Sequence, residues 1–450
     1  MITNKFSAIQ RRVLSTTFIC RVNKQFFKSI NMDQNYPKKN EDRMLKHLFD
    51  GSDWNVYDKN ITNLGVGAPG PDILVKCCDI FEKATSHRMK LETTNQGMLF
   101  QYGPTVGVIE VRSGIAKFLT DAYKSEVKSE DIIVTTGATQ GLHIILSTLI
   151  DLNGYIFVDE VTYMIALDVF RQFSTLKIVP VKLNSDGVGI KALRAFLEQK
   201  QFKSETKSFW GLYYAIPTYH NPTGITFSKD VLKNLITLAR EFDILIACDD
   251  VYNTLYYGEN VAQKRLYAYD DPNDDDFKGN VISNGSFSKI IGPGLRFGWL
   301  EVPPRCKSIL ETCGLLNSGG CLNNYTSGIM ASLLDLGLGQ AHAKMVKELY
   351  EERMLATCDI LRNNLPKSCQ FIEPQGGYFV WIQMPEDTDA NAFLQICIKR
   401  HKLFFIPGNR FSLDNNFKNC FRISIAFHQK EVIQSSVRRI CNALKEYLNL

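Results

Sequence analysis

The sequence predicts an α/β protein with a mostly parallel central sheet flanked by helices, followed by a smaller α+β domain. In the middle of the chain, short runs rich in β-branched residues alternate with segments of helical apolar spacing, a pattern typical of parallel sheets. After about residue 325 the pattern changes to long amphipathic helices and then to short strands. A chain of 450 residues can bury a core large enough for two or three domains.

Five apolar runs are the expected strands of the central sheet, and a helix is expected after the first of them. A glycine-containing turn at 137–140 follows the first run, and residues 141–150 have the apolar spacing of a helix. The five runs lie at 132–136, 155–159, 210–216, 243–248 and 281–284.

The C-terminal part is expected to pack helices against antiparallel strands. Residues 324–363 predict a long helix, and residues 377–383 and 420–425 predict strands. The expected organisation is an N-terminal leader and arm at 1–60, a large domain at 61–320 and a small C-terminal domain at 321–450.

Charge is distributed unevenly along the chain. The net charge is +5, yet residues 1–32 contain six lysines and arginines and no acidic residue, so the remainder is close to neutral. A nearly neutral body gives no reason to expect nucleic acid as a partner. The basic leader, rich in serine and threonine, is typical of mitochondrial transit peptides. A basic leader that is not imported and translation from Met32 are the alternatives, so the expected compartment is mitochondrial or cytoplasmic.

Cysteine spacing and hydropathy exclude several classes of protein. The twelve cysteines are scattered, without a CxxC pair or a Cys/His ligand spacing, so neither a disulfide framework nor a metal site is expected. The longest apolar runs fall far short of the ~20 residues that span a bilayer, so no membrane segment is expected.

Polar residues follow the ends of several predicted strands. Asp249 follows the apolar run ILIAC, Tyr252 comes three residues later, and Asn221 lies in the segment HNPTG after another strand. In an open parallel sheet, ligands bind at the carboxyl ends of the strands. Each residue alone has a structural explanation, such as a turn for NPTG or a helix N-cap for Asp249. Their repetition after successive strands instead indicates a ligand site.

Lys289 is the most informative of these residues. It ends the run Ser286–Lys289 after an apolar strand, and a buried lysine loses proton affinity by desolvation and becomes a usable nucleophile. Such an amine can bind an aldehyde cofactor covalently. Ser286, Arg296 and the helix that opens at 137–139 can bind the phosphate of that cofactor. The alternative is a loop lysine near a structural arginine.

Together these side chains match the requirements of pyridoxal 5′-phosphate. Its aldehyde requires an amine, its ring nitrogen a carboxylate, its ring oxygen a hydroxyl and an amide, and its phosphate a cradle of donors. Residues of those types are Lys289, Asp249, Tyr252 and Asn221, with the cradle at 137–139, Ser286 and Arg296.

Over residues 60–445 the chain resembles the class I and II aminotransferases, which belong to the fold-type I pyridoxal-phosphate enzymes. The segment NLGVGAPG at 63–70 is similar to the family's substrate-facing glycine segment, and residues 101–119 are similar to its tyrosine–glycine motif and the helix that follows. The remaining motifs occur in family order: TTGATQG, DEVTY, HNPTG, DDVY, SFSK, PGLRFGW, PQGGYFVWI and FRISIAF.

The resemblance implies a role for each polar residue around the cofactor. Asp249 would pair with the pyridine nitrogen, while Asn221 and Tyr252 would bind the ring hydroxyl. Tyr163 would stack on the ring, and Tyr102 would reach the phosphate bound in the partner subunit, which implies a homodimer. The phosphate would be held by Gly137, Ala138, Thr139, Ser286 and Arg296.

The position of the carboxylate has an alternative, because Asp250 follows Asp249 directly. Successive residues of a strand face opposite ways, so only one of the two can face the ligand. The spacing to Tyr252 favours Asp249.

The resemblance also implies that Arg422 binds the α-carboxylate of the substrate, with Gly67 and Asn221 near it. A guanidinium fork suits a carboxylate, and Arg422 lies in a strand-like alternation. Arg410 and Arg296 are the alternatives for this role.

The implied activity is transfer of an amino group from an amino acid to a 2-oxo acid, with Lys289 moving a proton as general base and acid. The loop at 318–325 resembles the branch of 2-aminoadipate and aromatic amino-acid aminotransferases. Tyr102, Tyr163 and Tyr378 are candidates for aromatic walls of the cleft. We therefore expect an aromatic or long-chain donor, similar to 2-aminoadipate, with 2-oxoglutarate as acceptor.

Two other functions fit parts of the pattern. A β-lyase, a decarboxylase or a synthase that uses the same cofactor would share these residues. A non-catalytic descendant would be marked by loss of Lys289, Asp249 or Arg296, and all three are present.

Overall fold

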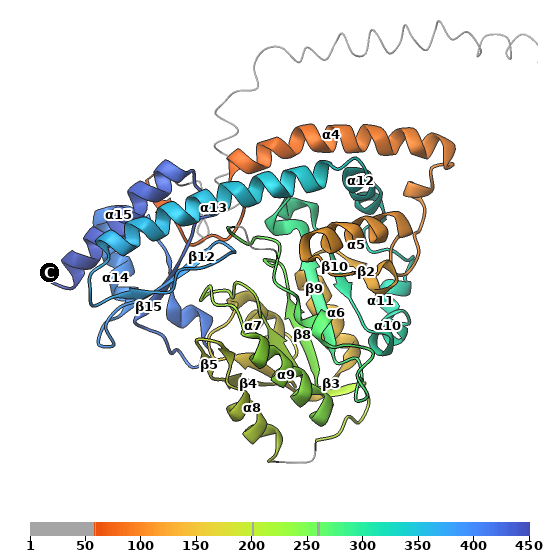
Figure 1. Ribbon diagram of the computed structural model, residues 1–450, viewed down its shortest axis with the longest axis horizontal. Coiled ribbons are helices and arrows are strands. Elements are labelled where there is room, and N and C mark those ends of the chain that lie inside the picture. The colour runs from red at the N-terminus through yellow and green to blue at the C-terminus, as the bar shows by residue number, and fades with distance from the viewer. Residues whose placement is uncertain (1–57, 59, 200–201, 259–261) are drawn as a thin grey trace, which may run out of the picture. The chain divides into compact units, whose positions relative to one another are not determined.

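A seven-stranded sheet organises much of the computed structural model, which describes residues 58, 60–199, 202–258 and 262–450 (Figure 1). In spatial order the strands are β2 (Ile132–Thr135), β10 (Gly298–Glu301), β9 (Val281–Ser286), β8 (Leu245–Asp249), β7 (Phe209–Ala215), β3 (Ile150–Asp159) and β4 (Lys177–Val181). Strand β10 runs antiparallel to β2 and β9, and the other neighbouring pairs are parallel. The mostly parallel sheet expected from the sequence is confirmed.

The strands β4 and β10 were not expected from the sequence. Strand β4 lies at the edge of the sheet and contains Pro180, which is tolerated there because an edge strand leaves N–H positions unpaired. Strand β10 is four residues long and ends at Glu301, a charged residue that hides the apolar pattern. In the fold, Glu301 is buried and forms an ion pair with Arg265. The apolar runs therefore predicted five of the seven strands of this sheet but not β4 and β10.

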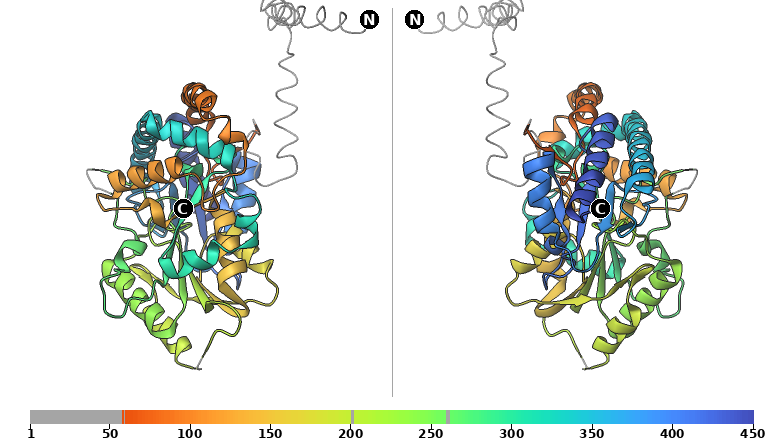
Figure 2. Two further views of the ribbon diagram at one scale, coloured as in Figure 1. Left: turned by 90° about the vertical axis from the view of Figure 1, so that its right-hand side faces the viewer. Right: turned by 90° about the vertical axis from the view of Figure 1, so that its left-hand side faces the viewer.

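The two faces of the sheet pack into different hydrophobic cores. On β7, Leu212 and Tyr214 belong to one core, whereas Tyr213 and Ala215 belong to the other, as strand alternation requires. Helices lie on both sides of the sheet (Figure 2). The first core includes α5 (Ile109–Tyr123), α6 (Ala138–Leu149), α7 (Met164–Arg171) and α10 (Pro304–Leu310), and the second includes α8 (Ile190–Leu197) and α9 (Lys229–Phe242).

A four-stranded antiparallel sheet lies in the C-terminal part of the chain. Its strands are β11 (Gln370–Phe371), β12 (Phe379–Gln383), β15 (Cys420–Ser424) and β14 (Ile406–Pro407), accompanied by α14 (Ala390–Ile396) and α15 (Lys430–Tyr447). The first described strand, β1 (Thr62–Asn63), pairs with β13 (Leu403–Phe404), so the segment before the large sheet is held against this part. Short elements elsewhere in the chain include β5 (Leu183–Asn184), β6 (Gly187–Val188) and α11 (Gly314–Asn317).

The single helix expected at 324–363 is wrong, because the structure has two helices there. Helix α12 (Asn324–Asp335) is separated from α13 (Leu338–Asn364) at Gly337, whose φ of 69° suits glycine and ends α12. Helix α12 packs against α4 (Pro71–Thr94) and α5, whereas α13 packs against α15. The division between large and small domains near residue 320 stays a prediction, and the leader at 1–32 lies outside the described residues.

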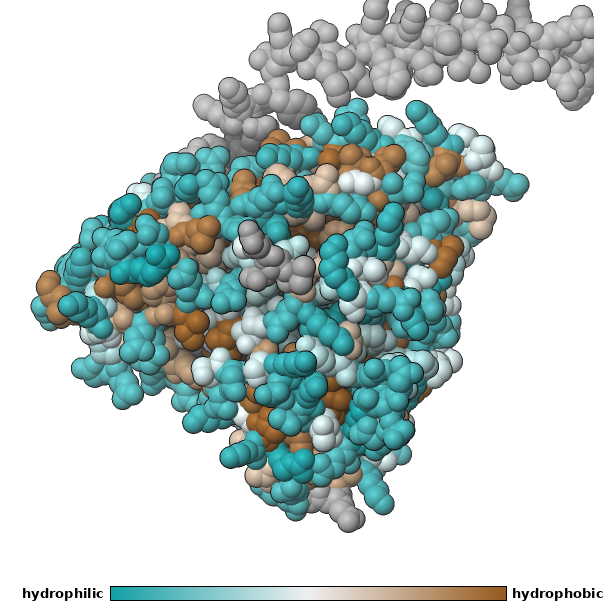
Figure 3. Space-filling model, in the orientation of Figure 1, coloured by the Kyte–Doolittle hydropathy of each residue, from teal (hydrophilic) through white to brown (hydrophobic). Residues whose placement is uncertain are grey.

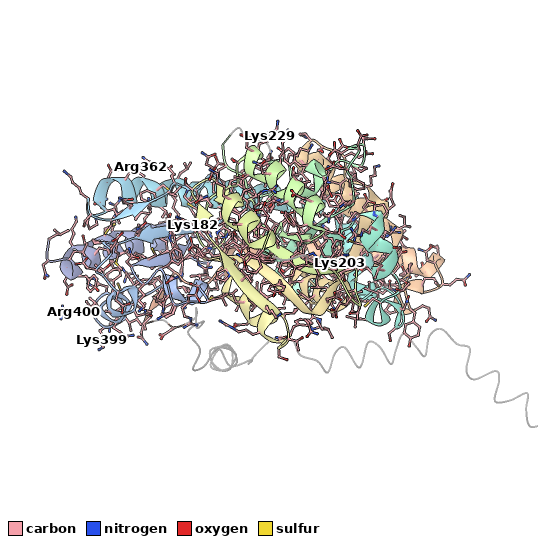
Figure 4. All side chains as sticks on the ribbon, turned by 90° about the horizontal axis from the view of Figure 1, so that it is seen from below. Lys182, Lys203, Lys229, Arg362, Lys399 and Arg400 are labelled. Carbon is pink, nitrogen blue, oxygen red and sulfur yellow. The ribbon has the colours of Figure 1, made fainter. Side chains whose placement is uncertain are left out.

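Polar side chains cover most of the surface shown in Figure 3, with small hydrophobic areas between them. Lys399 and Arg400 project together from the segment Cys397–His401, while Lys203 and Lys229 project from other parts of the chain (Figure 4). Among the described helices, none has the length and apolar character needed to cross a membrane.

Candidate active site

A cavity lies where β7, β8 and β9 end and α6 begins. The predicted site residues that line it are Ala138, Thr139, Tyr163, Asn221, Asp249, Tyr252, Ser286, Lys289 and Arg296. Gly67 and Arg422 do not line the cavity but bond to lining residues, Gly67 to Lys289 and Arg422 to Asn221. Tyr102 lies apart and is 78% exposed. The cavity therefore occupies the carboxyl edge of the parallel strands, where ligands bind in open α/β sheets.

Lys289 lies in the short turn Phe287–Lys289 directly after β9. Burial lowers the pKa of its amine to about 8, and the positive charges of Arg422 and Arg296 act in the same direction. The nearby carboxylate of Asp249 opposes this shift. The amine donates a hydrogen bond to the carbonyl of Gly67 at 3.4 Å. The amine is therefore less basic than that of an exposed lysine.

Asp249 is the last residue of β8 and faces the cavity on the same side as Ala247, two residues before it. Its Oδ2 accepts a hydrogen bond from the hydroxyl of Tyr214 at 2.6 Å. Its Oδ1 is buried and has no hydrogen-bond partner among the described residues. Burial raises the pKa of this carboxyl to about 6, against the opposing effects of Tyr214 and Lys289.

Asp250 has different surroundings from Asp249. It does not line the cavity and accepts a hydrogen bond from the Ser283 hydroxyl at 2.5 Å. Burial raises its pKa, and Ser283, Asn253 and the charge of Arg265 oppose the rise. The two adjacent carboxylates are thus separated by the strand geometry.

The N-terminus of α6 and Arg296 form another part of the cavity wall. Gly137 precedes α6 with a φ of 101°, and a Cβ at this position would lie 3.0 Å from Nη2 of Arg296. Asn284 of β9 donates a hydrogen bond to the carbonyl of Ala138 at 2.8 Å, which ties the helix to the sheet. The free N–H groups of a helix N-terminus next to a guanidinium are suited to bind an anion.

The hydroxyl of Ser286 is also part of the cavity wall. It lies 2.9 Å from the hydroxyl of Ser288 and 3.1 Å from the carbonyl of Phe297. Both serines line the cavity, as Arg296 does.

Arg422 lies on β15 of the smaller sheet and is buried without lining the cavity itself. Its Nη1 donates to Oδ1 of Asn221 at 2.6 Å, and its Nη2 donates to the carbonyl of Gly65 at 2.5 Å. The guanidinium lies over the ring of Phe379 at 3.9 Å. Burial lowers the pKa of Arg422 to about 10. Arg410, the alternative considered from the sequence, is exposed.

Aromatic side chains pack around the lysine side of the cavity. Tyr163 precedes α7, and burial together with the charge of Asp249 raises its pKa to about 12. Tyr252 packs edge-on against Tyr378, with ring centroids 5.3 Å apart. Tyr378 is buried behind the lining residues, and its hydroxyl donates to the carbonyl of Gly67 at 2.9 Å.

Sequence reasoning missed two polar residues of the cavity, Tyr214 and Ser288. Ser288 lies within the SFSK motif, and its position next to Lys289 was the available signal. Tyr214 lies in the middle of β7, where it resembles any aromatic residue of a buried strand. Its hydrogen bond to Asp249 depends on the pairing of β7 with β8, which the sequence does not show.

Comparisons with known proteins identify the family. The model of the family "Aminotransferase class I and II" matches residues 59–440. Aromatic-amino-acid aminotransferase 1 of Thermococcus litoralis is 28% identical over 392 residues, covering 87% of this chain and 89% of the relative. The 2-aminoadipate transaminase of Thermus thermophilus is 26% identical over 399 residues, covering 87% and 91%.

A solved structure gives the same result. The kynurenine aminotransferase of Pyrococcus horikoshii, solved in complex with PMP, has a TM-score of 0.75 and 26% identity, covering 94% of this chain and 96% of the other. The expected fold type I is thereby confirmed. The chain belongs to the class I and II aminotransferases and is a pyridoxal-phosphate-dependent aminotransferase of fold type I.

Proposed function

We propose that this cavity is the catalytic site, with Lys289 as its central residue. The observation that carries the proposal is that the amine of Lys289 shares the cavity with Asp249, whose Oδ1 has no partner among the described residues. Buried polar atoms of a purely structural core are normally hydrogen-bonded. An unpartnered carboxylate oxygen beside a lysine of lowered pKa supports a site built to receive a ligand.

The cavity residues fit pyridoxal 5′-phosphate. When bound, the cofactor supplies an electron sink for the bonds at the substrate α-carbon. Lys289 would hold the aldehyde, and Oδ1 of Asp249 would accept the hydrogen bond of the ring N–H. Asn221 and Tyr252 would bind the ring hydroxyl, and Tyr163 would cover the ring. The phosphate would be held by Gly137, Ala138, Thr139, Ser286 and Arg296, to which we add Ser288.

Lys289 is proposed to move the proton of the reaction. With a pKa of about 8, on the order of one-tenth of its amine is unprotonated at pH 7. The neutral amine can take up the proton that leaves the substrate α-carbon, and the ammonium can return it. The hydrogen bond to Gly67 restricts where the amine points.

Arg422 is proposed to bind the substrate α-carboxylate. Each terminal nitrogen of its guanidinium carries two hydrogens and donates one of them to Asn221 or Gly65. The other hydrogens, together with Nε, which has no partner among the described residues, remain available for a carboxylate. A planar fork of this kind holds a carboxylate through two hydrogen bonds and so fixes its orientation.

The proposed substrates are an aromatic or long-chain amino acid, similar to 2-aminoadipate, and 2-oxoglutarate. The relatives named for aromatic amino acids, 2-aminoadipate and kynurenine support this proposal.

Comparing kcat/KM across amino donors tests the substrate proposal. We expect 2-aminoadipate, kynurenine, phenylalanine, tyrosine or leucine to react faster than aspartate or alanine. A clear preference for aspartate or alanine would contradict the substrate proposal and leave the aminotransferase activity intact.

A homodimer is proposed as the working form. Met98, Phe100, Tyr102 and Tyr325 are exposed by 58%, 70%, 78% and 48%. The rings of Phe100 and Tyr325 lie 6.0 Å apart, and the ring of Tyr102 lies against Gly319 in the loop at 318–325. Exposed aromatic residues gathered from two distant segments mark an interaction surface. A second copy that covered this surface could bring its Tyr102 to the cavity, as the family resemblance implies.

We also propose that residues 1–32 direct the chain to mitochondria, since they carry six basic and no acidic residues. Locating a tagged full-length chain in cells tests this, and a purely cytoplasmic distribution would contradict it.

A further inference from the structure

The carbonyl of Gly67 receives hydrogen bonds from two sides. The amine of Lys289 donates to it at 3.4 Å, and the hydroxyl of Tyr378 donates to it at 2.9 Å. A carbonyl oxygen has two lone pairs and can accept both bonds at once. The shorter bond comes from Tyr378, so its hydroxyl is the stronger of the two hydrogen-bond partners of this oxygen.

The backbone around Gly67 is fixed mainly by contacts from the smaller sheet. Arg422 holds the carbonyl of Gly65, and Tyr378 holds that of Gly67. A Cβ at residue 67 would lie 2.5 Å from the ring of Phe379 and 3.1 Å from that of Tyr378. The backbone therefore packs directly on these two rings, and no side chain could be inserted between them.

Tyr378 is itself held firmly. It is fully buried, and its ring packs edge-on against Tyr252 and Tyr350, with centroids 5.3 and 5.5 Å away. A rigid donor of this kind can transmit its position to the group that it binds.

We infer that Tyr378 is a positioning residue for Lys289, acting through the carbonyl of Gly67. This inference rests on the proposed function, in which Lys289 binds the cofactor and moves the proton. Tyr378 is not a lining residue of the cavity. Its contribution is to place the carbonyl that orients the lysine amine, so its loss should affect the chemical step more than substrate binding.

The variant Tyr378→Phe tests the inference, because it removes only the hydroxyl. Tyr350→Phe is the matched control, since the Tyr350 hydroxyl is equally buried and has no hydrogen-bond partner among the described residues. For Tyr378→Phe we expect kcat to fall roughly tenfold while KM changes less than about twofold, as expected for a misplaced catalytic group. Tyr350→Phe should keep the wild-type values.

A second measurement does not depend on turnover. Apoprotein is mixed with pyridoxal 5′-phosphate at pH 9, where most of the Lys289 amine is unprotonated, and the absorbance change of the cofactor is followed. We expect slower capture by Tyr378→Phe than by wild type or Tyr350→Phe, with equal melting temperatures of the three apoproteins.

Equal kcat and capture rates for Tyr378→Phe and wild type would overturn the inference. A fall in kcat that is accompanied by a higher KM and a lower melting temperature would also overturn it, because that pattern indicates a structural role. If the wild-type apoprotein itself leaves the cofactor absorbance unchanged, the proposed function fails as well, and the two failures are thus distinguishable.

Discussion

At the scale of single residues, the site depends on two groups whose burial moves their pKa values towards each other. The pKa of the Lys289 amine is lowered to about 8, and the pKa of the Asp249 carboxyl is raised to about 6. Burial is the main cause in both cases, because it disfavours the charged form. The site is therefore costly for the fold, as expected when side chains are arranged for chemistry rather than for stability.

Replacing Asp249 separates its effect on the stability of the fold from its effect on cofactor binding. Asp249→Asn should stabilise the apoprotein at pH 7, because a neutral amide replaces a carboxyl whose pKa burial raises to about 6 and which is therefore buried mostly as the charged form at this pH; the gain is on the order of 1 kcal/mol. The same variant should bind pyridoxal 5′-phosphate more weakly. Thermal unfolding and cofactor titration measure the two effects.

Asp250→Asn is the control for this pair. Asp250 lies outside the cavity, so this variant should change cofactor affinity much less than Asp249→Asn. Equal losses of affinity in the two variants would remove the distinction between the adjacent carboxylates.

The pH dependence of cofactor capture reports the pKa of Lys289. Only the unprotonated amine attacks an aldehyde, so the capture rate of the apoprotein should rise with pH and level off above about 8. An ordinary exposed lysine would continue to gain rate up to about 10.4. Stopped-flow absorbance between pH 6 and pH 10 distinguishes the two curves, and a midpoint near 10 would contradict burial of the amine.

At the scale of elements, the N-terminus of α6 is the part of the site that is most sensitive to backbone shape. Gly137 has a φ of 101°, and a Cβ there would approach Arg296 to 3.0 Å. Gly137→Ala should therefore weaken binding of pyridoxal 5′-phosphate roughly tenfold or more, through strain and displacement of the guanidinium.

Two controls test the origin of that effect. Gly294→Ala lies beside Arg296 in sequence, meets no atom within 4 Å of its added Cβ and should bind the cofactor normally. Pyridoxal without the phosphate should bind equally to Gly137→Ala and wild type. An equal loss for pyridoxal would mean that the phosphate end is not involved.

Strands that consist of a continuous buried apolar run could be predicted from the sequence. A strand that contains a charged residue, buried only because another segment supplies its ion-pair partner, could not. The runs that became β2, β7, β8 and β9 are buried along their length and were found within one or two residues. Strand β10 was missed because Glu301 carries a charge whose partner, Arg265, lies in another segment. The break at Gly337 was missed because a glycine inside a helical pattern does not by itself end a helix.

The same limit applies to the site. Residue types after strand ends indicated most of the cavity lining, since parallel strands bring their ends together. The bonds from Arg422 to Asn221 and from Tyr378 to Gly67 connect residues separated by 201 and 311 positions. Contacts of that kind arise only when the two sheets are packed, and no local pattern encodes them.

At the scale of the whole molecule, the exposed aromatic residues around Tyr102 predict a second copy. Replacing Phe100, which is 70% exposed, with Asp places a charge in the proposed interface and should shift a dimer towards monomer in analytical ultracentrifugation. Val75→Asp is the control, because Val75 is 63% exposed on α4 and is not part of this aromatic group. A monomeric wild-type protein with full activity would contradict the proposed dimer.

The central claim is that this chain transfers amino groups through Lys289. The most direct measurement is the first half of the reaction, in which the wild-type holoenzyme is mixed with an amino donor and the cofactor absorbance and the released 2-oxo acid are followed together. We expect wild type and Lys229→Ala, an exposed-lysine control, to release one 2-oxo acid per site at the same rate. Lys289→Ala should be slower by at least ~100-fold. A Lys289→Ala protein that reacts as fast as wild type would contradict the account.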